Sequence, residues 1–245
     1  MKAPCGRLLT RYSLTGSWLL VLGTWGTLVS AQEQDPYRTA REAMVDLIVE
    51  YGVRDSATLA AMRSVPRHEF VPSAVRNLAY ENHPLRIEQG QTISQPYIVA
   101  YMTEVLHVQP GMKILEVGTG SGYQAAVLAA IGAHVFTVEI FEALANSARA
   151  RLQRLGYHNV TVRHGDGYLG WEEEAPFDAV IVTAAPDHIP PALIDQLKSG
   201  GRLVIPVGSE YGVQTLILGE KRPDGRFSTR NLLAVRFVPL LRLPL

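Results

Sequence analysis

The chain has almost no cysteine: Cys5 is the single one among 245 residues. It lies in a leader segment that we expect to be separate from the folded domain, and too far from the end of that segment to be a lipid-attachment cysteine. The rest of the chain therefore has no disulfide, no thiol nucleophile and no thiolate metal ligand. We predict no metal site.

The chain has no excess of either charge, because 23 Lys and Arg residues balance 23 Asp and Glu residues. Residues 1–31 contain Lys2, Arg7, Arg11 and no acid, so residues 32–245 carry a formal charge of −3. Neither value favours a nucleic-acid partner, which would need a basic surface.

The leader lacks the length of a membrane span. Its apolar part, residues 18–29, has 12 positions, whereas a transmembrane helix needs about 20. A basic start precedes this run, and the small residues 29–31 (VSA) end it, which is typical of a cleaved export signal. The alternative is a mis-assigned start codon upstream of a cytosolic protein. We predict a signal-like leader at residues 1–31 and a single domain at residues 32–245.

The stretch at residues 113–123 (KILEVGTGSGY) organises the domain. An apolar run enters a glycine-rich turn, and a helix-forming run follows at residues 125–130, which predicts strand, loop and helix. A dinucleotide fingerprint requires a third glycine where Tyr123 stands. The spacing from Gly118 through Gly120 to Gly122 instead favours a nucleoside with a small zwitterionic tail. A tight connection without a ligand is the alternative.

Two acids flank this loop. Glu116 stands two positions before Gly118, where a carboxylate would repel a pyrophosphate and help to hold an ammonium group. Glu139 ends a second strand-like run at residues 134–139, 21 residues beyond Gly118. In a βαβ unit such an acid lies beside the first loop and accepts hydrogen bonds from ribose hydroxyls.

A helical region precedes the loop. Apolar spacing predicts a helix at residues 40–51 and another through Met62, capped by Asp55 or Ser56. His68 is interpreted as a surface or core histidine. A third helix, from Pro96 to about His107, follows the polar residues 88–95.

Ser94 allows two interpretations. It is a plausible N-cap of the third helix, or a carboxylate receptor together with the amides at the helix start. It does not look like an acyl-transfer nucleophile, because no G-x-S-x-G elbow surrounds it.

The remaining chain alternates strands and helices, which predicts a largely parallel sheet covered on both faces. The predicted fold class is α/β, with a doubly wound, mostly parallel sheet at residues 113–245 and a helical preface with a substrate segment at residues 32–112. The order of the last strands is left open. The predicted strands lie at residues 160–164, 177–183, 202–207, 215–219 and 233–238, and a helix at residues 192–198.

Several motifs together resemble the protein-L-isoaspartate O-methyltransferase family, from about residue 41 to residue 240. The segments around Ser94 and Arg236 are distinctive, whereas many methyltransferases share the glycine loop; the leader departs from the usual pattern. The motifs are residues 90–97 (GQTISQPY), 115–124 (LEVGTGSGYQ), 163–167 (RHGDG), 176–186 (PFDAVIVTAAP), 200–208 (GGRLVIPVG) and 235–240 (VRFVPL).

The resemblance implies a Rossmann-like class I methyltransferase that uses S-adenosylmethionine. Gly118, Gly120 and Gly122 would shape the cofactor pocket, with Glu116 near the ammonium group and Glu139 on the ribose. Asp166, followed by Gly167, would accept a hydrogen bond from the adenine amino group; a turn residue is the alternative. Ser94, the family's active-site serine, would orient the substrate carboxyl, and Thr92 would assist. His164 is interpreted as structural.

The implied reaction is methyl transfer to the α-carboxyl of L-isoaspartyl residues in damaged proteins and peptides. A small-molecule methyltransferase, a nicotinamide-dependent dehydrogenase and a non-catalytic module of the same fold are the alternatives. We expect a monomer without a stable membrane span. The family resemblance implies a cytoplasmic location, whereas the leader itself favours export after cleavage near Ala31.

Overall fold

The computed structural model describes residues 35–209 and 212–243. The predicted leader at residues 1–31 lies outside the described residues. From Pro36 onward, the described residues form one compact unit. None of the helices in the described part of the chain is long and apolar enough to cross a membrane.

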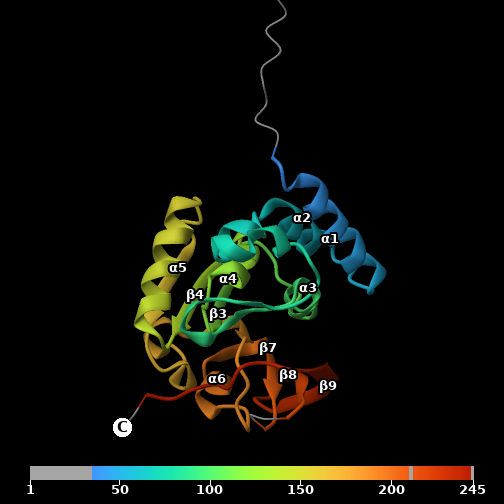
Figure 1. Cartoon of the computed structure of the whole chain (residues 1–245). Coiled ribbons are helices and arrows are strands. Elements are labelled where there is room, and N and C mark those ends of the chain that lie inside the picture. Colours follow the sequence, from blue (N-terminus) through green and yellow to red (C-terminus); the bar gives the residue numbers. More distant parts are fainter. Residues whose placement is uncertain (1–34, 210–211, 244–245) are drawn as a thin grey trace, which may run out of the picture. The chain divides into compact units, whose positions relative to one another are not determined.

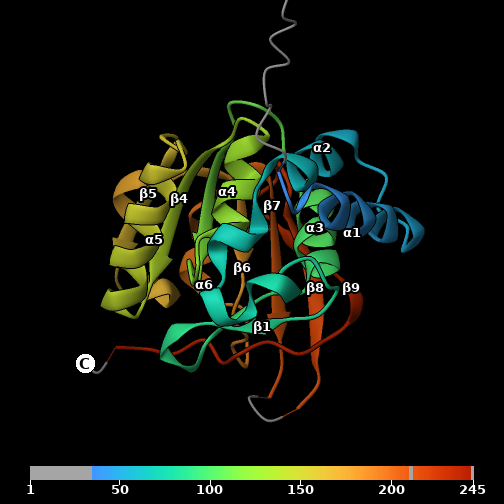
Figure 2. The same cartoon turned by 45° about the horizontal axis from the view of Figure 1, so that its top comes forward.

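A seven-stranded sheet forms the centre of this unit (Figure 2). Its order is β5-β4-β3-β6-β7-β8-β9. The first five strands in this order are parallel, and β8 and β9 are antiparallel additions. The strands are β3 (Lys113–Val117), β4 (His134–Glu139), β5 (Val160–His164), β6 (Phe177–Val182), β7 (Leu197–Val207), β8 (Gln214–Lys221) and β9 (Phe227–Val235). The prediction of a mostly parallel sheet is confirmed, and the order of its last strands is now defined.

The chain reverses its direction of travel across the sheet at β3. From β3 it proceeds to β4 and β5 on one side, and it returns to β6 and β7 on the other. The loops that leave the carboxyl ends of β3 and β6 therefore diverge to opposite sides. Such a switch point leaves a crevice where ligands bind in α/β sheets.

The two faces of the sheet carry separate hydrophobic cores, because successive side chains of a strand point to opposite faces. Ile114 belongs to the core formed with the longer helices, and Leu115 and Val117 belong to the other. Glu116 must then point to the same face as Ile114. The helices of the first core are α1 (Arg38–Glu50), α2 (Ser56–Ser64), α3 (Pro96–Val105), α4 (Tyr123–Ala130) and α5 (Glu142–Arg154), and α6 (Pro191–Asp195) contributes to the second.

The helical preface is confirmed as the region of α1, α2 and α3, which contact one another (Figure 1). Asp55 caps α2 as predicted, because its side chain accepts a hydrogen bond from the Thr58 amide at 2.7 Å. A small antiparallel pair, β1 (Leu85–Arg86) and β2 (Thr92–Ile93), leads into α3. Single 3-10 turns occur at η1 (Arg67–Phe70), η2 (Ser73–Leu78), η3 (Glu88–Gly90), η4 (Gly167–Leu169) and η5 (Glu172–Glu174).

The helix predicted at residues 192–198 is wrong in its second half. α6 ends at Asp195, and β7 already begins at Leu197. Leu197 is buried beside Phe177 of β6, its partner in the sheet, so the strand gains apolar contacts that one more helical turn would forfeit. α3 also ends earlier than expected, at Val105, and His107 has a positive φ of 54°.

Candidate functional site

Two adjoining cavities lie at the carboxyl ends of β3, β4 and β6, and a third lies beside them at the carboxyl end of β9. The loop cavity is lined by Gly118, Gly120, Glu139, Phe141, Gly167, Thr183 and residues 238–241, among others. The inner pocket is lined by Ser94, Glu116, Gly118, Thr119, Gly120 and Thr183, among others. The serine cleft is lined by Ser94, Gln95, Val213, Arg236 and Phe237, among others. Thr92 lines all three.

Two shared walls connect these cavities. Gly118, Gly120 and Thr183 line both the loop cavity and the inner pocket. Ser94 lines both the inner pocket and the serine cleft. The structure therefore brings the glycine loop close to Ser94 and Gln95. In the sequence, Gly118 lies 23 positions after Gln95.

The glycine loop needs glycine for conformation and for space. Gly118 has φ of 96°, and a Cβ there would lie 2.5 Å from the Thr183 hydroxyl oxygen, which donates to the Gly118 carbonyl at 2.6 Å. Gly122, with φ of 88°, starts α4, and a Cβ on it would approach Leu152 of α5 at 3.2 Å. Gly118 and Gly120 thus form the cavity wall, whereas Gly122 sets the start of the helix behind it.

Both oxygens of Glu139 bind backbone amides beside the loop cavity. Oε2 accepts from the Gly120 N–H at 2.7 Å, and Oε1 accepts from the Phe141 N–H at 3.0 Å. The residue is 5% exposed. A carboxylate has about four acceptor positions, so this fixed group retains lone pairs for hydroxyls of a ligand.

Asp166 directly precedes Gly167 of the loop cavity and is held by its own turn. Oδ1 accepts from the Tyr168 N–H at 2.9 Å and caps η4, while Oδ2 lies 3.4 Å from Nε of Arg242. The next residue, Gly167, lines the cavity, and a Cβ on it would overlap a methyl group of Val117. The turn and ligand interpretations of Asp166 are therefore compatible. Oδ1 caps the turn, whereas Oδ2 contacts only the long side chain of Arg242 among the described residues.

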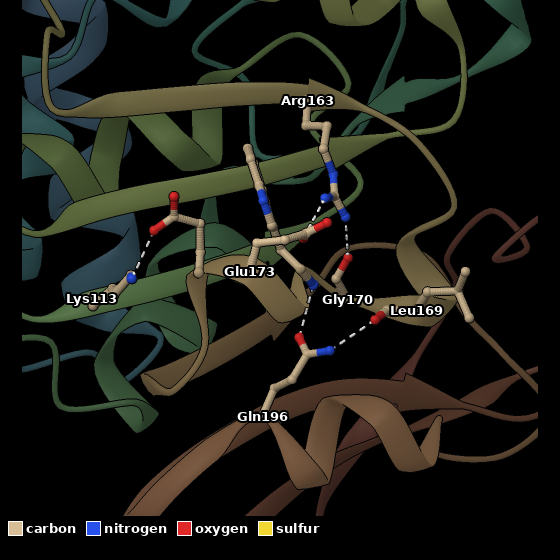
Figure 3. A network of polar contacts seen from close by, with 8 residues as sticks. Lys113, Arg163, Leu169, Gly170, Glu173 and Gln196 are labelled. Atoms are coloured by element: carbon tan, nitrogen blue, oxygen red, sulfur yellow. Dashed lines mark hydrogen bonds and ion pairs between the residues drawn. The ribbon is translucent and has the colours of Figure 1, made fainter.

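A polar network fixes the segment that follows Asp166 (Figure 3). Gln196 accepts from the Trp171 N–H at 2.8 Å and donates to the Leu169 carbonyl at 2.9 Å. Arg163 donates to the Gly170 carbonyl at 2.7 Å and pairs with Glu173 at 3.0 Å. The network thereby anchors the turn that presents Gly167 to the loop cavity.

Glu116 lies at the base of the inner pocket as a fully buried acid. Its exposure is 0%, and neither carboxyl oxygen has a well-formed hydrogen bond to another described residue. Burial raises the pKa of Glu116 to about 8, against a smaller lowering by the nearby Thr137 hydroxyl. An unpaired buried carboxyl is costly, so this group is available to a cationic ligand.

Ser94 is not the N-cap of α3. The N-cap is Gln95, whose side chain makes no capping bond, and Pro96 is the first helical residue. Proline has no N–H and its fixed φ already suits the first turn, so a serine cap contributes less here. The half-buried Ser94 hydroxyl makes no hydrogen bond to the described part of the protein, and Thr92 beside it is exposed. His164, which we interpreted as structural, contacts the Ile140 carbonyl at 3.1 Å.

The segment at residues 238–241 forms a wall of the loop cavity that the sequence pattern did not indicate. It is held along residues 184–186, since the Ala185 N–H donates to the Val238 carbonyl at 2.8 Å and the Leu240 N–H donates to the Ala185 carbonyl at 2.9 Å. The loop after β6 thus supports this wall and contributes Ala184 to it.

Comparison with known proteins identifies relatives of this chain. The family model described as protein-L-isoaspartate(D-aspartate) O-methyltransferase matches residues 39–243. A protein-L-isoaspartate O-methyltransferase 2 of Polaromonas sp. strain JS666 is 62% identical over 186 residues, covering 76% of this chain and 88% of its own. A protein of the same description from Syntrophobacter fumaroxidans is 54% identical over 239 residues, covering 92% of this chain and 96% of its own.

A solved structure of the same description has a similar fold and contains the product form of the expected cofactor. The protein-L-isoaspartate O-methyltransferase of Plasmodium falciparum, solved with S-adenosyl-L-homocysteine, superposes with a TM-score of 0.73 at 26% identity, covering 83% of this chain and 99% of its own. With the family model spanning both the glycine loop and the Ser94 segment, the chain belongs to the protein-L-isoaspartate O-methyltransferase family.

Proposed function

We propose that this chain transfers the methyl group of S-adenosylmethionine to the α-carboxylate of L-isoaspartyl residues in damaged proteins and peptides. One observation carries the proposal. Ser94, whose hydroxyl has no hydrogen bond to another described residue, lines both the inner pocket beside the glycine loop and the serine cleft. A substrate carboxylate in the cleft and a cofactor on the loop would meet at this residue.

The described residues fit S-adenosylmethionine. Gly118, Gly120 and Gly167 leave a cradle that side chains would fill. Glu139 offers acceptors to the ribose hydroxyls and Asp166 offers one to the adenine amino group. The Glu116 carboxyl, which has no hydrogen-bond partner among the described residues, suits an ammonium group. When bound, this cofactor supplies an electrophilic methyl group on a sulfonium.

The reaction places few chemical demands on the protein. A carboxylate with a reference pKa of about 3.5 to 4 is ionised at neutral pH, so no general base is required. The Ser94 hydroxyl would donate to one carboxylate oxygen and fix its direction, with Thr92 beside it. Such alignment of reacting atoms accounts for a large share of the rate in group transfer.

Repair follows from the product. A methyl ester has a better leaving group than a carboxylate, so the adjacent backbone nitrogen displaces methanol and closes a succinimide. Water opens this ring partly to normal aspartate. Because the substrate differs from aspartate by one extra backbone methylene, we propose that the serine cleft discriminates by backbone shape.

The proposal is tested with the full chain, methyl-labelled S-adenosylmethionine and two peptides that differ only in an aspartyl or isoaspartyl linkage. We expect base-labile label on the isoaspartyl peptide alone. Equal labelling would contradict specificity for damage. Label on neither peptide, with the cofactor bound, would favour a small-molecule methyltransferase or a non-catalytic module.

Cofactor affinity should depend on pH through Glu116. The carboxyl must ionise to pair with an ammonium group, and its pKa is raised from 4.5 to about 8 by burial. We expect the affinity for S-adenosylhomocysteine, which carries the same ammonium, to rise by up to about tenfold per pH unit between pH 6 and 8. Calorimetric titration would measure it, and Glu116→Gln should remove the slope.

The stability of the ligand-free protein should change in the opposite direction. Because the folded-state pKa of Glu116 lies above its ordinary value of 4.5, its stabilising contribution is complete below pH 4.5 and is lost as pH rises to about 8. Glu116→Gln should flatten this part of the stability profile. A wild-type slope that persists in the variant would assign the titration to another group.

For the compartment we propose export, because the leader has the three-part pattern of a signal peptide. Family membership favours the cytoplasm, where S-adenosylmethionine is made. Cell fractionation and sequencing of the mature N-terminus decide between them, with Gln32 expected as the first residue after cleavage. We also propose a monomer, since one chain lines all three cavities; light scattering would measure its mass.

A further inference from the structure

Arg67, in η1, is a fully buried cation. Its exposure is 0%, and burial lowers its pKa to about 10. No carboxylate in the described ranges forms an ion pair with it. A buried charge without a counter-charge costs several kcal/mol in typical proteins, so hydrogen bonds and ring contacts must hold it.

The guanidinium joins the Ser94 segment to the start of α4. Its Nη2 donates to the Ser94 carbonyl at 2.7 Å, and its Nε donates to the Ala79 carbonyl at 2.7 Å. Its Cζ lies 4.7 Å from the centre of the Tyr123 ring. Tyr123 is the first residue of α4, directly after the glycine loop. Arg67 therefore contacts both elements whose relative position the reaction requires.

The bond to Ser94 also orients the following amide. In a trans peptide the C=O and N–H point in opposite directions, so the Gln95 N–H points away from Arg67. Gln95 lines the serine cleft with Ser94, and its N–H makes no hydrogen bond to another described residue. A cationic donor on the carbonyl polarises the whole peptide unit and strengthens this N–H as a donor.

Stability alone does not account for this arrangement. The third nitrogen of the guanidinium, Nη1, is buried without a hydrogen-bond partner in the described part of the chain. An apolar side chain of similar volume would avoid that cost. A functional role explains why arginine stands here despite this cost in stability: its hydrogen bond fixes the position of the Ser94 peptide, which the reaction would use.

We infer that Arg67 is a positioning residue for methyl transfer: it fixes the Ser94–Gln95 peptide so that the Ser94 hydroxyl and the Gln95 N–H both face the substrate carboxylate. The inference rests on the proposed function, because it needs a carboxylate in the serine cleft. Arg67 itself touches neither substrate nor cofactor and acts through the backbone of Ser94.

A double-mutant cycle tests the inference. Arg67→Met, which keeps the volume and removes the donors, should lower kcat for an isoaspartyl peptide about 30-fold, in line with the loss of a charge-assisted hydrogen bond. The affinity of Arg67→Met for S-adenosylhomocysteine should stay within about twofold of the wild type, because cofactor binding at the glycine loop does not require the hydrogen bond from Arg67 to the Ser94 carbonyl. In a Ser94→Ala background the same substitution should lower kcat by much less than about 30-fold, because one of the two donors that Arg67 positions is gone and only the Gln95 N–H remains.

Two further variants keep the result interpretable. Arg67→Lys retains the charge but cannot reach both carbonyls as a fork, so we expect a partial loss of kcat with a Tm near that of the wild type. Arg63→Met is the matched control, because Arg63 lies on α2 in a half-exposed pair with Glu42 at 3.2 Å. It should leave kcat unchanged.

Three outcomes would overturn the inference: full kcat in a folded Arg67→Lys or Arg67→Met protein, losses that multiply fully with Ser94→Ala, or a fall in cofactor affinity parallel to kcat. If Arg67→Met does not fold, the inference is tested with Arg67→Lys instead, by measuring kcat in a double-mutant cycle with Ser94→Ala. Absence of methyl transfer to the isoaspartyl peptide by the wild-type protein would contradict the proposed function, whereas unchanged turnover in Ser94→Ala would contradict only the role of its hydroxyl, so the failures are distinguishable.

Discussion

Ser94→Ala is expected to lower the turnover of an isoaspartyl peptide about 100-fold, the order of effect produced by misplacing a reacting group by about 1 Å. The hydroxyl has no hydrogen bond to another described residue and lines both the inner pocket and the serine cleft. Its removal therefore leaves the carboxylate without a directional donor and disturbs no bond within the protein. Affinity for S-adenosylhomocysteine and Tm should remain close to those of the wild type.

Steady-state kinetics with the isoaspartyl peptide and calorimetry with S-adenosylhomocysteine would measure both quantities. Ser147→Ala on α5 is a suitable control, because that exposed hydroxyl accepts a bond from Arg151 at 3.3 Å and lines none of the three cavities. Equal losses of turnover and cofactor affinity in Ser94→Ala would place the serine in the structure of the pocket instead of in substrate orientation.

Glu139→Gln is expected to weaken cofactor binding about 100-fold, which corresponds to about 2.7 kcal/mol. Each carboxylate oxygen of Glu139 accepts a backbone N–H, from Gly120 at 2.7 Å and from Phe141 at 3.0 Å. In glutamine one oxygen becomes an NH₂ donor, so one of these amides faces another donor inside a nearly closed site. The glycine loop then loses its anchor, and a ribose hydroxyl loses an anionic acceptor.

Binding of S-adenosylhomocysteine by calorimetry would test this prediction. Glu142→Gln is the matched control, since Glu142 is exposed at the start of α5, three positions further along. An affinity in Glu139→Gln within about threefold of the wild type, a difference below about 1 kcal/mol, would contradict both the contact with the ribose and the need for this loop anchor in cofactor binding.

The central strands were predictable because their pattern is local. β3 and β4 occupy the ranges expected from their apolar runs, since a strand lies on each side of them and most of their residues are buried. The edge strand β5 also occupies its expected range, although Val162 is its one buried residue. The start of β7 was not predictable. Leu197 becomes a strand residue only through its partner Phe177, 20 residues earlier in the chain, and no short-range pattern records that pairing.

In the site, too, residues placed by a local sequence pattern were predictable, whereas residues placed by contacts between distant positions were not. Gly118, Glu116 and Glu139 lie where the spacing around one βαβ unit predicts: Gly118 lines both the loop cavity and the inner pocket, Glu139 lines the first and Glu116 the second. Arg67 was not identified, because its segment reads as packing and its contact with Ser94 spans 27 positions. The wall at residues 238–241 was missed for the same reason, since its contacts with Ala185 depend on tertiary structure.

That wall has a consequence for synthesis. The two sides of the loop cavity are separated by about 120 residues of chain, with Gly118 and Gly120 on one side and residues 238–241 on the other. During translation the glycine loop leaves the ribosome long before the segment that covers it. The nascent chain therefore carries only half of the cavity, and a ligand can contribute binding free energy to folding only after residue 241 has emerged. Until then the early strands must rely on their own hydrophobic burial.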